Sequence, residues 1–255
     1  MAPTSAASPD PTPDWTRIDT VCLDMDGTVL DLRFDNLFWL EVLPRRWGAE
    51  RGLDYEQALT QLLPRFDARR GTLEWYCIDH WSEELGIDIP ALKREHRDAI
   101  RYLDGAPAFL DLLRQLGKRV LLATNAHPLS LEVKNSVTGL ERHFDELVSS
   151  HEFGVPKESA VFWKKMHESH DVDVRTTLFV DDSAAVLHGA LAAGVAWLYQ
   201  VLQPDSTRPP HVAVPGIPGI RRLADLQPSV VVQLATGASG PGFTPPSAGP
   251  DASSP

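Results

Sequence analysis

Short apolar runs of strand length alternate with helical patterns along most of the chain. Continuously apolar runs predict buried strands at 20–24, 119–124, 146–150, 177–182 and 195–199. Apolar residues at helical spacing predict helices at 107–117, 128–139, 158–170 and 183–194. Strands that are apolar on both faces and separated by single helices are typical of a parallel sheet covered on both sides. The fold class is therefore predicted as α/β, with a doubly wound, Rossmann-like parallel sheet.

Residues 33–103 break this alternation directly after the first strand. Helical patterns follow one another there without a strand between them, at 36–48, 54–71, 72–86 and 89–103. The alternating pattern resumes near residue 104. We therefore expect an inserted α-helical cap domain at 33–103, beside a core domain made of residues 14–32 and 104–227.

Both ends of the chain have compositions that disfavour a packed structure. Residues 1–13 are small, polar and rich in proline, and residues 228–255 are mostly Gly, Pro, Ser and Ala, so both are predicted to be disordered tails. The first residues lack the basic and apolar regions of a signal peptide. The apolar run at 190–202 is too short to span a bilayer. We expect a cytoplasmic protein without a membrane partner.

The charge balance excludes one class of partner and raises a question about substrates. Lys and Arg number 24 against 35 Asp and Glu, which gives a net charge of −11. Such a chain has no bulk attraction for nucleic acid or anionic lipid, so an anionic substrate would need a local device such as a divalent cation. The two cysteines, Cys22 and Cys77, do not form a disulfide framework, and their spacing does not suggest a thiolate metal site.

Polar side chains stand where four of the predicted strands end. Because the carboxyl ends of parallel strands meet at one edge of a sheet, we expect these side chains to lie together. They comprise four acids, a hydroxyl, an amide and an ammonium, a set suited to phosphoryl transfer. The residues are Asp24, Asp26, Thr124, Asn125, Lys157, Asp181 and Asp182.

These strand ends carry a set of motifs in a recognisable order. The segments DMDGT at 24–28, LLATN at 121–125 and LFVDD at 178–182, with Lys157 between the last two, resemble the four motifs of the haloacid dehalogenase (HAD) superfamily. The resemblance covers nearly all of residues 18–200. Within that superfamily, LDMDGTVLDLRFDNLFW, LEWYCIDHWSEELG and LLATNAHP resemble segments of bacterial GMP/IMP nucleotidases, which are purine 5′-nucleotidases with a helical cap.

The resemblance implies a covalent mechanism on two acids. Asp24 would attack phosphorus and form an aspartyl-phosphate, and Asp26 would protonate the leaving oxygen and later accept a proton from the attacking water. Dehalogenases of the superfamily need no general acid at the second position. The acid at residue 26 therefore favours a phosphatase.

The resemblance also implies a cofactor and a phosphate site. Mg²⁺ would be held by the carboxylates of Asp24 and Asp181 and the backbone carbonyl of Asp26, with Asp182 orienting a bound water or Lys157. The phosphate would be bound by Thr124, the Asn125 backbone amide and Lys157.

Simpler interpretations exist for several of these residues. Thr124, Asn125 and Asp182 could cap the helices that follow them, and Lys157 could be a surface lysine. The cap aromatic residues could stack on a purine or form an ordinary core, the basic stretch 92–97 reads as a solvated helix face, and the histidines show no zinc-binding spacing. The aromatic residues concerned are Trp39, Trp47, Trp75, Trp81 and Tyr76.

The expected substrate is a purine nucleoside 5′-monophosphate such as GMP or IMP. Three alternatives stay open: a phosphatase acting on a sugar phosphate or phosphoglycolate, a phosphomutase, and a non-catalytic binding protein on the same fold. The acids at positions 24 and 26 argue against the last. The oligomeric state cannot be predicted from these patterns.

Overall fold

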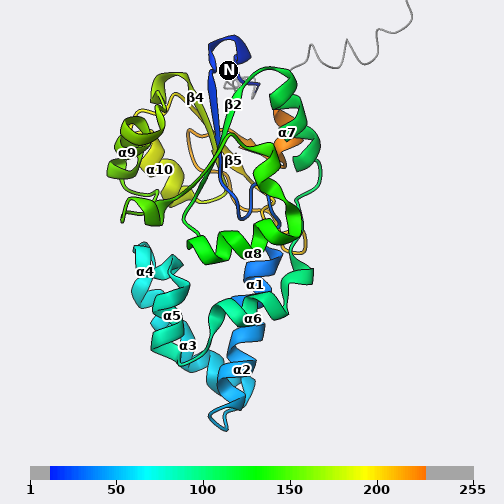
Figure 1. Ribbon diagram of the computed structural model, residues 1–255, viewed down its shortest axis with the longest axis vertical. Coiled ribbons are helices and arrows are strands. Elements are labelled where there is room, and N and C mark those ends of the chain that lie inside the picture. Colours follow the sequence, from blue (N-terminus) through cyan, green and yellow to red (C-terminus); the bar gives the residue numbers. More distant parts are fainter. Residues whose placement is uncertain (1–11, 228–255) are drawn as a thin grey trace, which may run out of the picture.

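A computed structural model describes residues 12–227 of the chain. Its centre is a six-stranded sheet in the order β3-β2-β1-β4-β5-β6, and every neighbouring pair is parallel. The predicted doubly wound parallel sheet is confirmed, with β1 between the two halves (Figure 1). The strands are β1 (Thr20–Leu23), β2 (Arg119–Thr124), β3 (Glu146–Ser149), β4 (Thr177–Asp181), β5 (Trp197–Val201) and β6 (Gly219–Ile220). The last of these was not predicted, because a strand of two residues has no periodicity to detect.

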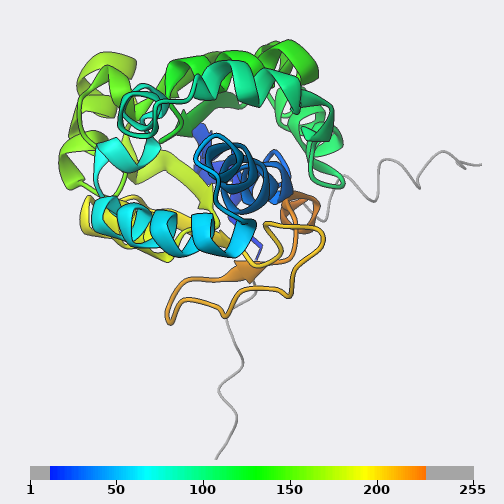
Figure 2. The same ribbon diagram turned by 90° about the horizontal axis from the view of Figure 1, so that it is seen from below.

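Helices cover both faces of this sheet, and the strand pattern explains why. Successive side chains of a strand point to opposite faces, so Val21 and Leu23 enter one apolar core and Cys22 enters the other. The first core is closed by α7 and by parts of α8, and the second by α9 and α10 (Figures 1 and 2). These helices are α7 (Ala106–Gln115), α8 (Pro128–Thr138), α9 (Ala160–His170) and α10 (Ala184–Ala192).

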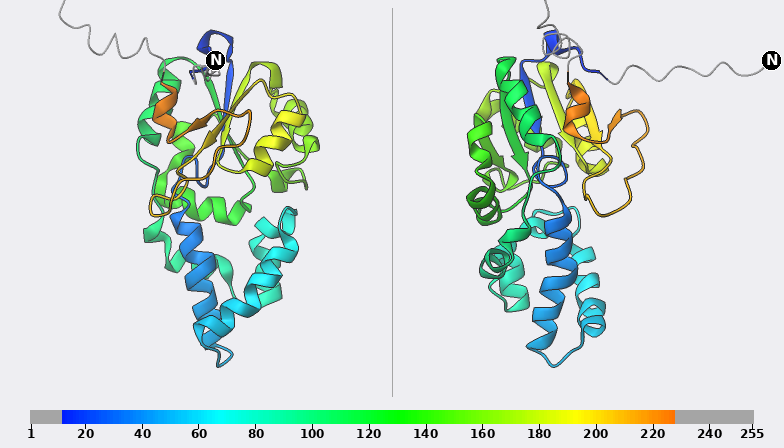
Figure 3. Two further views of the ribbon diagram at one scale, coloured as in Figure 1. Left: turned by 180° about the vertical axis from the view of Figure 1, so that it is seen from behind. Right: turned by 90° about the vertical axis from the view of Figure 1, so that its right-hand side faces the viewer.

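Six helices between β1 and β2 form a separate group, which we call the helical insert. It lies beyond one end of the sheet, on the side of α8 (Figures 1 and 3), and it has an aromatic-rich core of its own. A five-residue π-helix, Phe38–Val42, joins α1 to α2, and an extended residue, Cys77, separates α4 from α5. The helices are α1 (Arg33–Leu37), α2 (Leu43–Ala49), α3 (Tyr55–Arg69), α4 (Leu73–Tyr76), α5 (Ile78–Leu85) and α6 (Ile89–Glu95).

Short 3-10 turns complete the fold. They are Trp15–Arg17, Arg97–Ala99, Leu140–His143, Ser150–Glu152, Val174–Thr176 and Leu223–Leu226. The predicted C-terminal tail and all but two residues of the predicted N-terminal tail lie outside the described residues. Within 12–227, every helix is too short or too polar to cross a bilayer.

The turn after β1 fixes how the first acids are presented. The Asp24 backbone N–H donates to Val180 O at 3.0 Å, and the Gly27 N–H donates to Leu30 O at 2.7 Å. Gly27 has a φ of +94°, and a Cβ there would lie 2.8 Å from Cγ of Asp182. Two features favour glycine at this position: the left-handed backbone and the close approach of the Asp182 side chain.

Candidate active site

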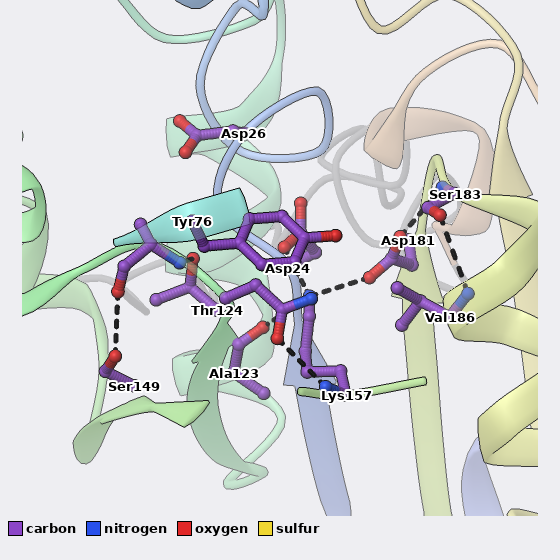
Figure 4. Close-up of polar contacts among 12 residues, drawn as sticks. Asp24, Asp26, Tyr76, Ala123, Thr124, Ser149, Lys157, Asp181, Ser183 and Val186 are labelled. Carbon is purple, nitrogen blue, oxygen red and sulfur yellow. Dashed lines mark hydrogen bonds and ion pairs between the residues drawn. The ribbon is translucent and has the colours of Figure 1, made fainter. Parts of the chain in front are cut away.

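The side chains predicted at the strand ends converge on one cavity between the sheet and the helical insert. Asp24 follows β1, Thr124 and Asp181 are the last residues of β2 and β4, and Lys157 lies in the loop after β3 (Figure 4). The cavity has a volume of about 500 Å³, within the range of small-molecule sites. From the sheet side it is lined by Asp24, Asp26, Thr124, Asn125, Lys157, Asp181 and Asp182, the whole predicted set.

Lys157 is buried and fully hydrogen-bonded. Its Nζ donates to Asp24 Oδ1 at 2.5 Å, to Asp181 Oδ2 at 2.8 Å and to the Ala123 carbonyl at 2.9 Å. Burial alone would lower the pKa of Lys157, but the charges of Asp181 and Asp24 outweigh it and raise that pKa above its usual range. The ammonium is therefore charged, and two of its three N–H groups fix the carboxylates of Asp24 and Asp181.

Three carboxylates surround this single ammonium, and we call the group the Lys157 cluster. Carboxylate oxygens of Asp24, Asp181 and Asp182 lie within 4.8 Å of one another. Burial, reinforced by Asp181, raises the pKa of Asp24 to about 7 against the opposing charge of Lys157. Burial raises the pKa of Asp181, and burial with the charges of Asp181 and Asp24 raises that of Asp182 well above its usual value.

The charge of the Lys157 cluster is thus not balanced by the chain itself. One ammonium faces three carboxylates, and burial, together with the neighbouring acids at Asp24 and Asp182, raises the pKa values in spite of that ammonium. The available donors are all oxygens, the ligands that a hard divalent cation prefers. These residues therefore fit a metal ion of that kind.

A second buried group, the Lys134 cluster, lies beside the first. Nζ of Lys134 is 2.5 Å from Asp26 Oδ1 and 2.6 Å from Asp35 Oδ2, and Nζ of Lys93 is 2.9 Å from Asp35 Oδ1. Burial raises the pKa of Asp26 to about 6, with Lys134 opposing the shift. At Asp35 burial acts in the same direction, but Lys134 and Lys93 outweigh it and hold the pKa below its usual range. Two ammoniums and two carboxylates balance here.

Lys93 and Lys134 were missed by the sequence analysis. The interpretation of 92–97 as a solvated helix face is wrong at Lys93, which is 1% exposed because it pairs with Asp35. Lys134 is also 1% exposed. A signal did exist for it, since Ser130, Val133 and Lys134 share the buried face of α8 at helical spacing.

Asn125 lies between the loop that carries Lys157 and the helical insert. Its Oδ1 accepts from the Lys157 backbone N–H at 2.9 Å, and its Nδ2 donates to Glu158 Oε2 at 2.9 Å. The Tyr76 hydroxyl, from the end of α4, donates to Glu158 Oε1 at 2.8 Å. Glu158 and Tyr76 therefore form a polar contact between insert and core that the motifs did not reveal.

Helix α10 sits tightly against the same loop. A Cβ at Gly189 would lie 2.3 Å from the Glu158 carbonyl oxygen. The helix is capped by Ser183, whose Oγ accepts from the Val186 N–H at 3.5 Å. The cap role considered for Asp182 is thus filled by its neighbour, and Asp182 faces the cavity.

The opposite wall of the cavity is aromatic and comes from the helical insert. Trp39 and Trp75 are half-buried and line the cavity, whereas Trp47 is buried in the core of the insert away from it. Trp81 lines the cavity but is 1% exposed, with edge-to-face contacts to Trp39 and Trp75. Of the four predicted tryptophans, Trp39 and Trp75 are therefore placed to contact a ligand.

Comparison with known proteins agrees with this geometry. The family model described as haloacid dehalogenase-like hydrolase matches residues 18–194. The GMP/IMP nucleotidase YrfG of Escherichia coli (strain K12) is 43% identical over 192 residues, which make up 75% of this chain and 86% of that protein. The resemblance to bacterial GMP/IMP nucleotidases is therefore confirmed as a relationship of sequence.

Solved structures share the fold at lower identity. A HAD phosphatase from Thermococcus onnurineus superposes with a TM-score of 0.69 at 18% identity, covering 86% of this chain and 98% of that one. A putative β-phosphoglucomutase from Thermotoga maritima gives 0.60 at 18% identity, covering 85% and 100%. With the family match, the nucleotidase relative and the four strand-end motifs around one cavity, the chain is an enzyme that belongs to the haloacid dehalogenase-like hydrolases.

Proposed function

We propose that this hydrolase is a Mg²⁺-dependent phosphomonoesterase in which Asp24 is the nucleophile. The observation that carries the proposal is the fixing of Asp24 Oδ1 by Lys157, next to Asp181 and Asp182, at the carboxyl end of the central strand. A carboxylate that is held in this way and lines the cavity is suited to attack on phosphorus. The attack breaks the bond to the leaving oxygen and leaves an aspartyl-phosphate, which water then hydrolyses.

Asp26 is proposed as the general acid and base of the two steps. It protonates the leaving oxygen in the first step and removes a proton from the attacking water in the second. A pKa of about 6 supports both states near neutral pH. Lys134 acts through Asp26: it holds that carboxyl in position and opposes the rise of its pKa.

Thr124 and the Asn125 N–H are proposed to bind the phosphate oxygens together with Lys157, which contributes its charge because its three N–H groups are already engaged. Their positions at the strand ends and the charge of Lys157 support this role, because the transition state spreads negative charge over those oxygens. The carboxylates of Asp24 and Asp181 and the backbone carbonyl of Asp26 are proposed Mg²⁺ ligands, with Asp182 beside them. When bound, Mg²⁺ supplies positive charge that offsets the acids and the phosphate.

The proposed substrate is a purine nucleoside 5′-monophosphate, with GMP and IMP first. The sequence relationship to a GMP/IMP nucleotidase supports it, as does the aromatic wall of Trp39 and Trp75, on which a purine can stack. The helical insert is proposed as the cap domain, residues 33–103, which closes over the base and excludes water. The cytoplasmic location stays a prediction.

A substrate panel tests this assignment. The full chain is incubated with Mg²⁺ and each phosphomonoester, and phosphate release is measured as kcat/KM for GMP, IMP, AMP, a pyrimidine nucleotide, hexose phosphates and phosphoglycolate. We expect the highest values for GMP and IMP. A preference for hexose phosphates or phosphoglycolate would remove the nucleotidase assignment, and conversion of a sugar phosphate to its isomer without phosphate release would replace hydrolysis by a mutase reaction.

The stacking role has its own control. Trp75→Leu should raise KM for GMP while leaving the hydrolysis of p-nitrophenyl phosphate, which has no purine, nearly unchanged. Equal losses for both substrates would remove the stacking role and leave only a structural one.

A further inference from the structure

Three metal-ligating side chains meet where the helical insert contacts the core, outside the carboxylate site. Cys77, His127 and His151 each offer one ligand atom, and these atoms lie within 4.8 Å of one another. Cys77 separates α4 from α5, His127 precedes α8, and His151 lies in the turn after β3. The three residues are far apart in the sequence, so a local sequence motif could not have predicted the group.

One ring nitrogen in this group has no partner in the described part of the chain. Nε2 of His151 is buried and without a hydrogen bond, although the ring does hydrogen-bond the backbone of Asn125. Since Nε2 is unpaired, that contact is made through Nδ1. A histidine whose other nitrogen binds a backbone carbonyl presents Nε2 as a lone pair, which is the arrangement found around protein-bound metals.

A carboxylate lies beside these three residues. Asp79 Oδ2 lies 3.5 Å from His127 Nε2, at the edge of the group, and brings a negative charge next to it. A Cys77 thiolate and the Asp79 carboxylate together balance the charge of a divalent cation.

We propose that Cys77, His127 and His151, with Asp79, form a binding site for a borderline-soft divalent cation such as Zn²⁺. Sulfur and imidazole donors select zinc over magnesium, which prefers oxygen. Zinc bonds of about 2.0 to 2.3 Å place tetrahedral ligands roughly 3.5 Å apart. Side-chain movements on the order of 1 Å would therefore bring the ligand atoms to these distances. Cys77 is the extended residue between α4 and α5, and Asp79 lies in the first turn of α5.

Occupation of this site would join the helical insert to the core. Cys77 and Asp79 belong to the insert, whereas His127 and His151 belong to loops after β2 and β3. The site adjoins the Tyr76–Glu158–Asn125 contact, which connects the same two parts. A bound ion thus favours the arrangement in which the insert lies against the sheet.

Metal binding without turnover tests the proposal. The reduced, metal-free full chain is titrated with Zn²⁺ against a chromophoric chelator, in a large excess of Mg²⁺ to occupy the carboxylate site. Cys77→Ser and His151→Asn remove ligands from the insert and the core, and His188→Asn removes an exposed imidazole on α10 as the matched control. Co²⁺ loading of the same four proteins reports the ligands directly, through thiolate-to-metal charge-transfer absorption and the intense visible bands of tetrahedral Co²⁺.

We expect one Zn²⁺ per chain in the native protein and in His188→Asn, with a thiolate–Co²⁺ spectrum in both. Loss of a direct ligand should weaken Zn²⁺ binding more than about 100-fold, the upper range for losing a partner outside the ligand set. Cys77→Ser should also lack the charge-transfer band. Equal Zn²⁺ affinity of Cys77→Ser and the native protein, or a native Co²⁺ spectrum without that band, would overturn the proposal. Circular dichroism of each variant verifies folding, and the spectrum of the native protein decides the question even if a variant fails to fold.

Discussion

The Lys157 cluster and the Lys134 cluster are buried at the same cavity, but they differ in charge balance. In the first, one ammonium faces three carboxylates, and the pKa of Asp24 rises to about 7. In the second, two ammoniums face two carboxylates, and the pKa of Asp35 falls below its usual range. The difference teaches that burial alone does not set the state of an acid. The number of ammoniums that each acid contacts also matters: the pKa of Asp35, which contacts two, falls, whereas that of Asp26, which contacts one, rises to about 6.

The largest expected effect is the loss of the nucleophile from the unbalanced cluster. Asp24→Asn should lower kcat for GMP by about 10³-fold or more, because the amide cannot form the phosphoenzyme. The fold should persist, since the change removes one of the excess negative charges. Phosphate release and circular dichroism measure the two properties. Asp173→Asn, which changes an aspartate at a surface ion pair, is the control. Turnover of Asp24→Asn at the native rate would remove this residue from the mechanism.

The next effect is a difference in stability between variants of Lys134 and Lys157. Lys134→Gln leaves Asp26 without an ammonium and Asp35 with one of its two, and it should lower the free energy of unfolding by about 3 to 5 kcal/mol, with or without Mg²⁺. Lys157→Gln should be destabilised similarly in a chelator but should recover partly in Mg²⁺, because the cation replaces the lost charge. Urea unfolding measures both, and Lys164→Gln on the exposed face of α9 is the control. Equal responses of the two variants to Mg²⁺ would contradict the distinction between the clusters.

The third effect is the dependence of stability on pH without the metal. Folding raises the pKa of Asp24 from about 3.9 to about 7. Its contribution to stability is therefore complete below the unfolded pKa and is lost as pH rises through about 7. The metal-free chain should lose stability between pH 5 and pH 8, and Mg²⁺ at 100 times its Kd should restore about 2.7 kcal/mol at the higher pH. Thermal unfolding with and without Mg²⁺ measures this, and an Mg²⁺ effect that shrinks as pH rises would contradict it.

The smallest effect is the pH dependence of the acid catalysis proposed for Asp26. A general acid with a pKa of about 6 must be protonated to assist a poor leaving group, so its assistance should decline by about tenfold per pH unit above that value. The leaving group of p-nitrophenyl phosphate needs no proton. We therefore expect the ratio of kcat/KM for GMP to kcat/KM for p-nitrophenyl phosphate to fall as pH rises from 6 to 8. A constant ratio would show that Asp26 does not act as the acid.

Much of the fold was predictable because its information is local. Continuous apolar strands and helices of ordinary spacing predicted the parallel sheet, and the absence of strand patterns in 33–103 predicted the helical region. The strand-end residues could be grouped because parallel strands bring their carboxyl ends together. Only β6 was missed.

The rest of the site depends on contacts between distant elements, which spacing does not encode. Lys93 meets Asp35 across two helices of the insert, and Lys134 joins them from the core. Cys77 and His127 likewise come together only when the insert lies against the sheet. Each of these residues looks ordinary in its own segment, and its partner is defined only by tertiary packing.

The tight contact at Gly189 shows how far the site extends through the backbone. Alanine is the better helix former by about 1 kcal/mol, so residue 189 looks like a safe position for improving α10. Yet a single methyl group there would collide with the carbonyl of Glu158, the residue next to the cluster's ammonium. Displacement of the Glu158 backbone would shift the neighbouring Lys157 and the contact of Glu158 with Tyr76. Neither the distance of Gly189 from the cavity nor the helix propensity of alanine would therefore reveal that this residue supports the position of Lys157 and its carboxylates.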